Sequence, residues 1–309
     1  MSIDPFLIPG PALISFSGGR TSAFMLWKIF QRGLQPDVHV LFCNTGKEDD
    51  RTLDFVHACD TRWDARVRWL QYRRRRLPYY KSAEVARTAA RLRKEFGLRL
   101  ERASNVEEPG FVEVDYRTAA RTNDVPSAEH PFTNLVCVSG VPNASTRLCT
   151  TELKIRVMKK FMLAQGYESW TNVVGIRADE PKRVARMRVN PPERWENAVP
   201  LADAGIGLEE VMGFWRKQPF DLDLEHDPVL GTFQGNCDLC HLKSEDKKVR
   251  LVREQPRALD WWMRIEANSE SLFRPALPYK EVRRLALVYD QPSRDPEQLT
   301  DLGDCVCHD

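Results

Sequence analysis

The sequence lacks an apolar run long enough to cross a membrane, and its N-terminus lacks the basic and apolar segments of a signal peptide. Its longest apolar stretches, residues 12–16 and 38–43, have only the length of strands. Internal repeats and low-complexity tracts are missing as well. We therefore expect a cytoplasmic globular protein without a membrane partner, since 309 residues with 42% hydrophobic content can bury a sizeable core.

The chain also has little net charge, but its charges are unevenly distributed. Against a formal net charge of +2, the stretch from Arg62 to Arg102 holds fourteen Lys or Arg and four acids, with four consecutive arginines at 73–76. Such a run is usually a solvated helix face. A surface that faces phosphate or nucleic acid is the alternative, so we keep nucleic acid as a partner that this stretch would bind.

Apolar runs alternate with segments of helical composition, which predicts an α/β fold with a parallel sheet and helices on both faces. The expected strands are residues 12–16, 38–43, 67–72 and 169–176, and the expected helices are residues 21–30, 52–59, 82–96 and 151–165. Residues 103–146 are expected to be mostly irregular. The pattern changes after about residue 200. We therefore divide the chain into an α/β domain, residues 1–215, and a smaller helical C-terminal region, residues 216–309, with a helix around residues 247–267.

A Ser-Gly-Gly turn lies between the first expected strand and the first expected helix. Glycines let the backbone approach an anion, and free N–H groups at the start of a helix complement negative charge. The turn follows the carboxyl end of a strand, which is the usual ligand side of an open parallel sheet. We predict phosphate binding, with a plain structural turn as the alternative, by Ser17, Gly18, Gly19, Arg20, Thr21 and Ser22.

This turn resembles the PP-loop of ATP pyrophosphatases and PAPS reductases, Ser-Gly-Gly-x-Asp-Ser, except that Thr21 stands at the Asp position. Two further segments resemble that family. Asn44-Thr45-Gly46-Lys47-Glu48 is similar to its Asp-Thr-Gly segment near the adenosine, and the segment from Gly175 to Arg183 is similar to Gly-x-Arg-x-x-Glu-x-x-Arg, which binds sulfate or phosphate. The resemblance assigns further nucleotide contacts to Asn44, Thr45, Gly46, Lys47, Gly175, Arg177, Glu180 and Arg183.

The family resemblance implies the PP-loop fold, also called adenine nucleotide alpha-hydrolase-like, in residues 1–215. It also implies an adenine nucleotide, ATP or adenylyl sulfate, as the ligand. Arg177 and Arg183 suit its anionic end because guanidinium groups stay charged and form paired hydrogen bonds to phosphate or sulfate oxygens. Thr21 in place of a carboxylate favours nucleotide binding over magnesium-dependent cleavage of ATP, so magnesium stays an open cofactor.

Eight cysteines without a secretory signal favour thiol, metal or redox chemistry over disulfides. Cys237-Asp238-Leu239-Cys240 has the C-x-x-C spacing of two metal ligands. Polar, irregular surroundings are expected at Cys137 and Cys149, whereas Cys43 and Cys59 are expected in the core. Resemblance to assimilatory adenylyl-sulfate reductases and to DNA phosphorothioation sulfur-transfer proteins implies a 4Fe–4S iron–sulfur cluster, with zinc as the alternative. The implied ligands are Cys137, Cys149, Cys237 and Cys240.

The sequence ends in Cys305-Val306-Cys307-His308-Asp309, which resembles the Glu-Cys-Gly-x-His tail of sulfonucleotide reductases. That resemblance implies that Cys305 or Cys307 is a catalytic nucleophile that attacks the substrate sulfur, and that a thioredoxin-like partner then releases sulfite. Three functions stay open. They are a thiol-dependent reductase of an adenylylated sulfate, an ATP-using sulfurtransferase acting on nucleic acid or a small molecule, and a nucleotide-sensing or metal-stabilised module that binds nucleic acid.

Overall fold

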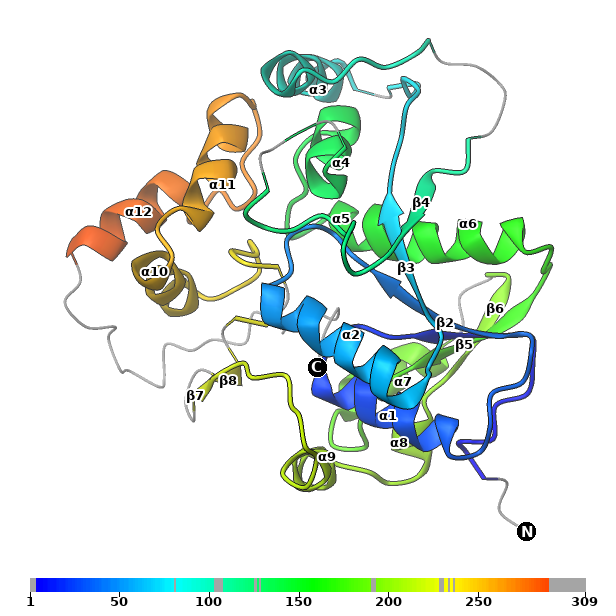
Figure 1. Cartoon of the computed structure of the whole chain (residues 1–309). Coiled ribbons are helices and arrows are strands. Elements are labelled where there is room, and N and C mark those ends of the chain that lie inside the picture. Colours follow the sequence, from blue (N-terminus) through cyan, green and yellow to red (C-terminus); the bar gives the residue numbers. More distant parts are fainter. Residues whose placement is uncertain are drawn as a thin grey trace.

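A six-stranded sheet forms the centre of the computed structural model, which describes residues 4–80, 82–102, 108–124, 127, 129–189, 193–227, 231–232, 234–235 and 237–288. The strand order is β4-β3-β2-β1-β5-β6 (Figure 1). The strands are β1 (Ala12–Ser15), β2 (Val38–Cys43), β3 (Val67–Tyr72), β4 (Phe111–Val114), β5 (Trp170–Val174) and β6 (Trp195–Ala198). Within this sheet β4 pairs antiparallel with β3, and all other neighbours are parallel. The predicted α/β sheet is confirmed, with an antiparallel edge strand added.

The two faces of the sheet bury two separate hydrophobic clusters, because successive residues of a strand point to opposite sides. Along β2, Val40 and Phe42 belong to the cluster shared with α1 (Arg20–Phe30), α2 (Asp50–Trp63) and α9 (Leu208–Trp215). Leu41 and Cys43 belong to the cluster shared with α4 (Pro131–Ser139) and α6 (Arg156–Ala164). Figure 1 shows these helix groups on opposite sides of the sheet. Helices on both faces are therefore confirmed.

The other elements before residue 245 complete this part of the described structure. They are α3 (Ala83–Phe96), α5 (Leu148–Thr150), the π-helical turn Thr151–Ile155, α7 (Pro181–Arg188), α8 (Pro200–Asp203), and the small hairpin of β7 (His226–Asp227) and β8 (Gly231–Thr232). The described part of residues 103–146 is mostly irregular, as expected, but β4 and α4 also form there. In α4 every residue from Pro131 to Val138 is buried, so the helix has no polar face and no amphipathic pattern in its sequence.

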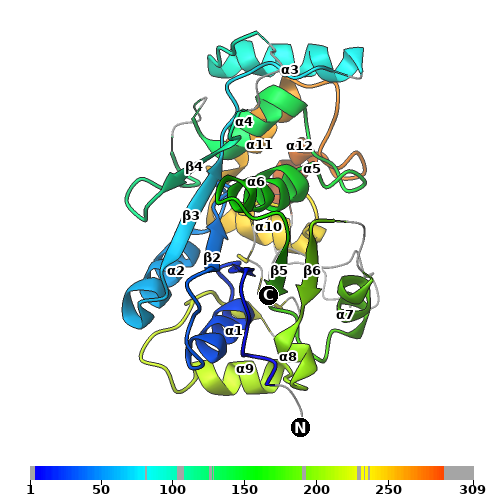
Figure 2. The same cartoon turned by 90° about the vertical axis from the view of Figure 1, so that its right-hand side faces the viewer.

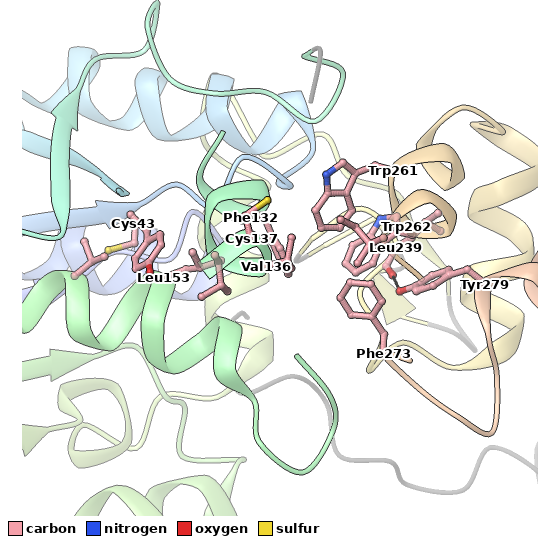
Figure 3. Close-up of a cluster of buried hydrophobic side chains, with 14 of the residues drawn as sticks. Cys43, Phe132, Val136, Cys137, Leu153, Leu239, Trp261, Trp262, Phe273 and Tyr279 are labelled. Carbon is pink, nitrogen blue, oxygen red and sulfur yellow. Dashed lines mark hydrogen bonds between the residues drawn. The ribbon is translucent and has the colours of Figure 1, made fainter. Parts of the chain in front are cut away.

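Three C-terminal helices extend the cluster on the α4 face: α10 (Glu245–Glu254), α11 (Ala258–Ala267) and α12 (Tyr279–Val288). Both views show them beside α4 (Figures 1 and 2). Trp262 and Tyr279, both fully buried, belong to the same cluster as Cys43 and Phe132 (Figure 3). The single helix expected around residues 247–267 is two helices, because Pro256 disfavours helical geometry at the preceding residue and breaks the hydrogen-bond ladder.

None of the helices in the described ranges is long and apolar enough to cross a membrane.

Candidate functional site

The glycine turn lies between β1 and α1 at the carboxyl edge of the sheet. Gly18 has φ +82°, a left-handed conformation that favours glycine. A Cβ atom at Gly18 would lie 2.8 Å from Thr52 Cγ2 and 3.2 Å from Phe42 Cε2. The turn therefore packs directly against the first turn of α2, with no room for a side chain at Gly18.

The start of α1 has polar groups that suit an anion. Its N-cap is Gly19, and among the described residues no side chain caps the first turn and no acid lies in it. Its first N–H groups and the positive end of the helix dipole are therefore available to a negative ligand. Ser17 Oγ and Ser22 Oγ lie 2.8 Å apart, and Ser22 Oγ donates to the Gly19 carbonyl at 3.0 Å.

Arg20, at the same helix end, is engaged elsewhere. Its guanidinium forms a paired interaction with Asp221, from Nε to Oδ1 at 2.7 Å and from Nη2 to Oδ2 at 2.9 Å. The Trp215 indole N–H donates to the Arg20 carbonyl at 3.0 Å. Arg20 thus holds α1 to α9 and the chain after it, and its predicted phosphate contact stays a prediction. Asp221 lies 201 residues further along the chain, and no sequence motif around it predicts this ion pair.

The segment after β5 lies directly beside the glycine turn, because β5 pairs with β1. A Cβ atom at Gly175 would lie 2.9 Å from Ser22 Cα. Arg177 Nη1 donates to Thr21 Oγ1 at 3.1 Å. Two motifs that are 156 residues apart in the sequence therefore meet at one place.

Carboxylates hold the two arginines of this segment. Arg177 Nε donates to Asp179 Oδ1 at 2.9 Å, and the backbone N–H of Arg177 donates to Glu180 Oε2 at 2.9 Å. Arg183 also forms an ion pair with Glu180. Arg177 is 9% exposed, so its charge is shielded from bulk water. Glu180 joins both arginines to one loop, and Asp179, which the motif comparison did not single out, orients Arg177.

The loop after β2 is held mostly by its own polar groups. Thr45 N and Oγ1 both donate to the Glu48 carboxylate, at 2.9 and 2.8 Å, and Gly46 N donates to Asn44 Oδ1 at 2.8 Å. Lys47 is 2% exposed and points to the C-terminal helices, where its Nζ lies 3.7 Å from Asp238 Oδ2 and 4.6 Å from the centre of the Trp261 ring. In this structure Lys47 faces Asp238 and Trp261.

His130, the N-cap residue of α4, contacts the same loop. Its Nε2 lies 2.9 Å from the Gly46 carbonyl, as expected for an N–H donor. Burial, followed by the nearby Lys47 charge, lowers the pKa of His130 to about 4. The imidazole is therefore neutral at pH 7. No sequence motif had pointed to His130 as part of this loop's environment.

Two of the predicted metal-binding cysteines lie near this loop. Cys237 forms a backbone bridge with Glu48, and its Sγ lies 3.6 Å from Thr45 Oγ1. Burial raises the pKa of the Cys237 thiol well above its usual value, and the charges of Glu48 and Cys149 raise it further. Cys149 is thus close enough to interact electrostatically with Cys237, next to the loop at the end of β2.

Cys137 is in a different environment. It lies on α4 with 0% exposure among apolar side chains, and burial raises the pKa of its thiol to about 12. The expected polar, irregular surroundings are wrong for Cys137, whereas the expected burial of Cys43 and Cys59 is confirmed. Within the described ranges no three His, Cys, Asp or Glu side chains are placed to hold a metal ion. A metal site built by Cys137, Cys149, Cys237 and Cys240 stays a prediction, and Cys305 and Cys307 lie outside the described residues.

The arginine run at 73–76 is largely paired with acids. Arg73 pairs with Glu129, Arg74 Nε lies 3.2 Å from Glu108 Oε1, and Arg76 Nε lies 3.6 Å from Glu101 Oε2. These pairs reduce the positive field that the sequence suggests, and the contact with nucleic acid stays a prediction.

Fold and site together define an α/β protein in which the loops after β1 and β5 meet at the carboxyl edge of a parallel sheet. No family model matches the sequence. The chain is 31% identical over 238 residues to the "Uncharacterized nin region protein ORF290" of Escherichia phage lambda, and the match covers 76% of this chain and 67% of the phage protein. The chain belongs to the family of that phage protein.

A crystal structure of phosphoadenylyl-sulfate (PAPS) reductase from Candida auris, in a phosphate complex, is similar over 70% of this chain and 80% of the reductase. The TM-score is 0.36 and the sequence identity is 10%. A likeness this weak is no basis for assigning an activity.

Proposed function

We propose that this protein is a PP-loop enzyme that binds an adenine nucleotide between the glycine turn and Arg177 and uses it in sulfur chemistry. The observation that carries the proposal is the contact of Arg177 with Thr21, together with the close approach of Gly175 to Ser22. It supports a shared role for two segments that separately resemble nucleotide- and sulfate-binding motifs. An uncapped helix start and an adjacent guanidinium are the donors that phosphate or sulfate oxygens need.

Thr21 has a specific consequence for this site. A carboxylate at that position would pair with Arg177 and cancel its charge, whereas the threonine hydroxyl only accepts a hydrogen bond from Nη1. Asp179 is half exposed, so a ligand anion can compete with it for the guanidinium. Arg177 would then stabilise the anion by a charge-assisted hydrogen bond worth roughly 1.5–3 kcal/mol.

The first candidate reaction is thiol-dependent reduction of adenylyl sulfate or its 3′-phosphorylated form. A tail thiolate, Cys305 or Cys307, attacks the sulfate sulfur, and the nucleotide leaves with the bridging oxygen and its electron pair. A thioredoxin-like dithiol then attacks the cysteine sulfur of the resulting thiosulfonate. Sulfite leaves, the tail cysteine is regenerated as a thiol, and the dithiol supplies two electrons by becoming a disulfide.

The second candidate is ATP-dependent sulfur transfer, which the position of Cys237 beside Thr45 favours. An acceptor oxygen attacks the α-phosphorus of ATP and pyrophosphate leaves. A sulfide nucleophile then displaces AMP, which leaves with the acceptor oxygen and its electron pair, so that sulfur replaces that oxygen. Neither scheme needs a step at a metal centre. An iron–sulfur cluster or zinc stays a prediction, which iron, sulfide and zinc measured on anaerobically purified protein would test.

Nucleotide binding comes first in the experimental test. Adenylyl sulfate, its 3′-phosphorylated form and ATP are titrated into wild type, Arg177→Gln and Arg186→Gln, where Arg186 is an exposed arginine on the same loop-to-helix unit. We expect Arg177→Gln to weaken binding by about 10- to 100-fold, while the control binds as wild type. Equal affinities in all three proteins would contradict the proposed site.

Product analysis then separates the reactions. Sulfite release with thioredoxin that is lost in Cys305→Ser or Cys307→Ser identifies the reductase. Pyrophosphate release from ATP that depends on an acceptor, without sulfite release, identifies the sulfurtransferase. Nucleotide binding without either product would leave a nucleotide-binding protein and contradict both enzymatic schemes.

A further inference from the structure

A cavity of about 840 Å³ lies behind the first turn of α2, apart from the groups assigned to the nucleotide phosphates. It is lined by that turn, by residues 122–123, by part of the 234–239 segment and by the junction of α10 and α11. Its volume lies within the range of about 300–1,000 Å³ that is usual for small-molecule sites. The start of α2 and the C-terminal helices thus build this cavity together.

The acids of the cavity lining already have cationic partners. Asp49 pairs with Arg51 at 2.9 Å, and Asp50 pairs with Arg121 at 3.0 Å. Asp238 lies 3.7 Å from Lys47 Nζ and accepts hydrogen bonds from Thr122 and the Trp262 indole. The remaining lining acid, at position 254, pairs with the arginine at position 250. The cavity therefore offers no cluster of unpaired acids to a metal ion.

The rest of the lining combines three carboxamides, Thr122 and the guanidinium groups of Arg51 and Arg257 with apolar side chains. Asn123, Gln234 and Gln255 each carry a donor and an acceptor, and Leu239 and Pro256 provide apolar walls. Gln234 is 5% exposed, and within the described ranges its Oε1 accepts no hydrogen bond. A buried acceptor without a donor costs free energy, and an N–H group of a ligand would remove that cost.

We infer that this cavity binds a nucleobase. Carboxamides pair with base edges through one donor and one acceptor, and a planar ring with little charge suits the apolar walls. Thr52 directly follows the lining residue Arg51, and its methyl group contacts Gly18. The base therefore belongs either to the nucleotide whose phosphates lie at the glycine turn or to a second nucleoside beside it. Only the first alternative rests on the proposed function.

Equilibrium titration with ATP, adenosine, cytidine and inorganic tripolyphosphate tests this inference. Ala258→Trp fills the cavity from the first position of α11, and Gln234→Leu removes the buried acceptor. Gln35→Leu is the matched control, because Gln35 is exposed and precedes β2 at the opposite edge of the sheet. Circular dichroism and thermal unfolding identify any variant that does not fold. If Gln234→Leu does not fold, the affinities measured for Ala258→Trp alone decide whether the cavity binds a base.

Both cavity variants should weaken the binding of at least one base-containing ligand by about ten-fold and leave tripolyphosphate binding unchanged. Weaker ATP binding would assign the cavity to the base of the nucleotide, and weaker nucleoside binding with normal ATP binding would assign it to a second nucleoside. Unchanged affinity for every base-containing ligand in Ala258→Trp would overturn the inference. Nucleoside binding without any ATP or tripolyphosphate binding would contradict the proposed function and support the cavity.

Discussion

The start of α1 and the segment from Cys237 to Lys243 are both rich in polar groups, but they differ in how far the protein satisfies them itself. No side chain of the described residues caps the first turn of α1. In the cysteine segment, Lys243 Nζ donates to the carbonyls of Gly235 and Cys237, and Lys248 Nζ donates to the carbonyl of His241. The first region keeps backbone N–H groups without a side-chain acceptor, whereas buried cations fix the backbone of the second.

The largest expected effect is on the stability of the cysteine segment. Trp262 is fully buried, and its indole N–H donates to Asp238 Oδ1 at 2.9 Å. Trp262→Ala should lower the free energy of unfolding by about 3–5 kcal/mol, because it leaves a cavity and removes one of the two N–H donors to Asp238 Oδ1. Urea denaturation measures this loss against Trp27→Ala, where the tryptophan is only half-buried. Equal losses in the two variants would show that Trp262 does not anchor the segment.

The second prediction compares two glycines to separate the stability cost of close packing at the glycine turn from the cost of a left-handed backbone. Gly18 and Gly33 have nearly the same φ, +82° and +81°, but a Cβ atom at Gly33 would meet nothing within 4 Å. Gly33→Ala should cost about 1–2 kcal/mol for the left-handed conformation. Gly18→Ala should cost about 3 kcal/mol, since its methyl group also collides with Thr52. Similar losses in urea denaturation would mean that the turn can move away from α2.

A pH effect of intermediate size is expected at His130. Its folded pKa, lowered to about 4, lies below the usual histidine value of 6.5, so between these values the unfolded chain binds a proton that the folded chain does not. Stability is therefore complete above pH 6.5 and falls as the pH drops toward 4, by about 1.4 kcal/mol per pH unit over most of this window.

His130→Asn removes this titration and keeps a side-chain donor for the Gly46 carbonyl. The free energy of unfolding, measured at pH 7 and pH 5, should fall by about 1–2 kcal/mol more in wild type than in His130→Asn. The same pH dependence in both proteins would contradict the burial of a neutral imidazole.

The smallest effect concerns Arg20. Because its guanidinium pairs with Asp221, Arg20→Gln should lower the free energy of unfolding by only about 1 kcal/mol. ATP affinity should fall less than in Arg177→Gln, because Asp221 already engages the Arg20 guanidinium. A loss of ATP affinity as large as that of Arg177→Gln would show that Arg20 turns toward the nucleotide after all.

Local sequence patterns predicted the central sheet well. β1 and β2 are apolar runs followed by turn residues, and β3 and β5 are rich enough in β-branched and aromatic residues to be recognised from a few neighbouring residues. β4 and β6 are four-residue edge strands that are only partly buried, so they lack a continuous apolar run. The loops after β1 and β5 meet because β1 and β5 are parallel neighbours, and parallel strands bring their carboxyl ends to one edge of the sheet.

Features set by partners far away in the sequence could not be predicted. Arg20 is held by Asp221, and Lys47 lies against Asp238 and Trp261; no motif near either residue signalled these partners. Cys137 resembled a metal ligand by its position, but its helix is buried on all sides. A motif specifies the backbone of a site, whereas the direction of each charged side chain depends on the charges that folding brings beside it.

Hydrogen exchange measured by mass spectrometry, with and without saturating ATP or adenylyl sulfate, tests the nucleotide site most directly. A nucleotide at the start of α1 should slow exchange in peptides covering residues 17–22 and 175–183. Peptides covering residues 237–243 should change little, because buried lysines already hold that backbone. Nucleotide binding that leaves residues 17–22 and 175–183 unprotected would contradict the site at the glycine turn.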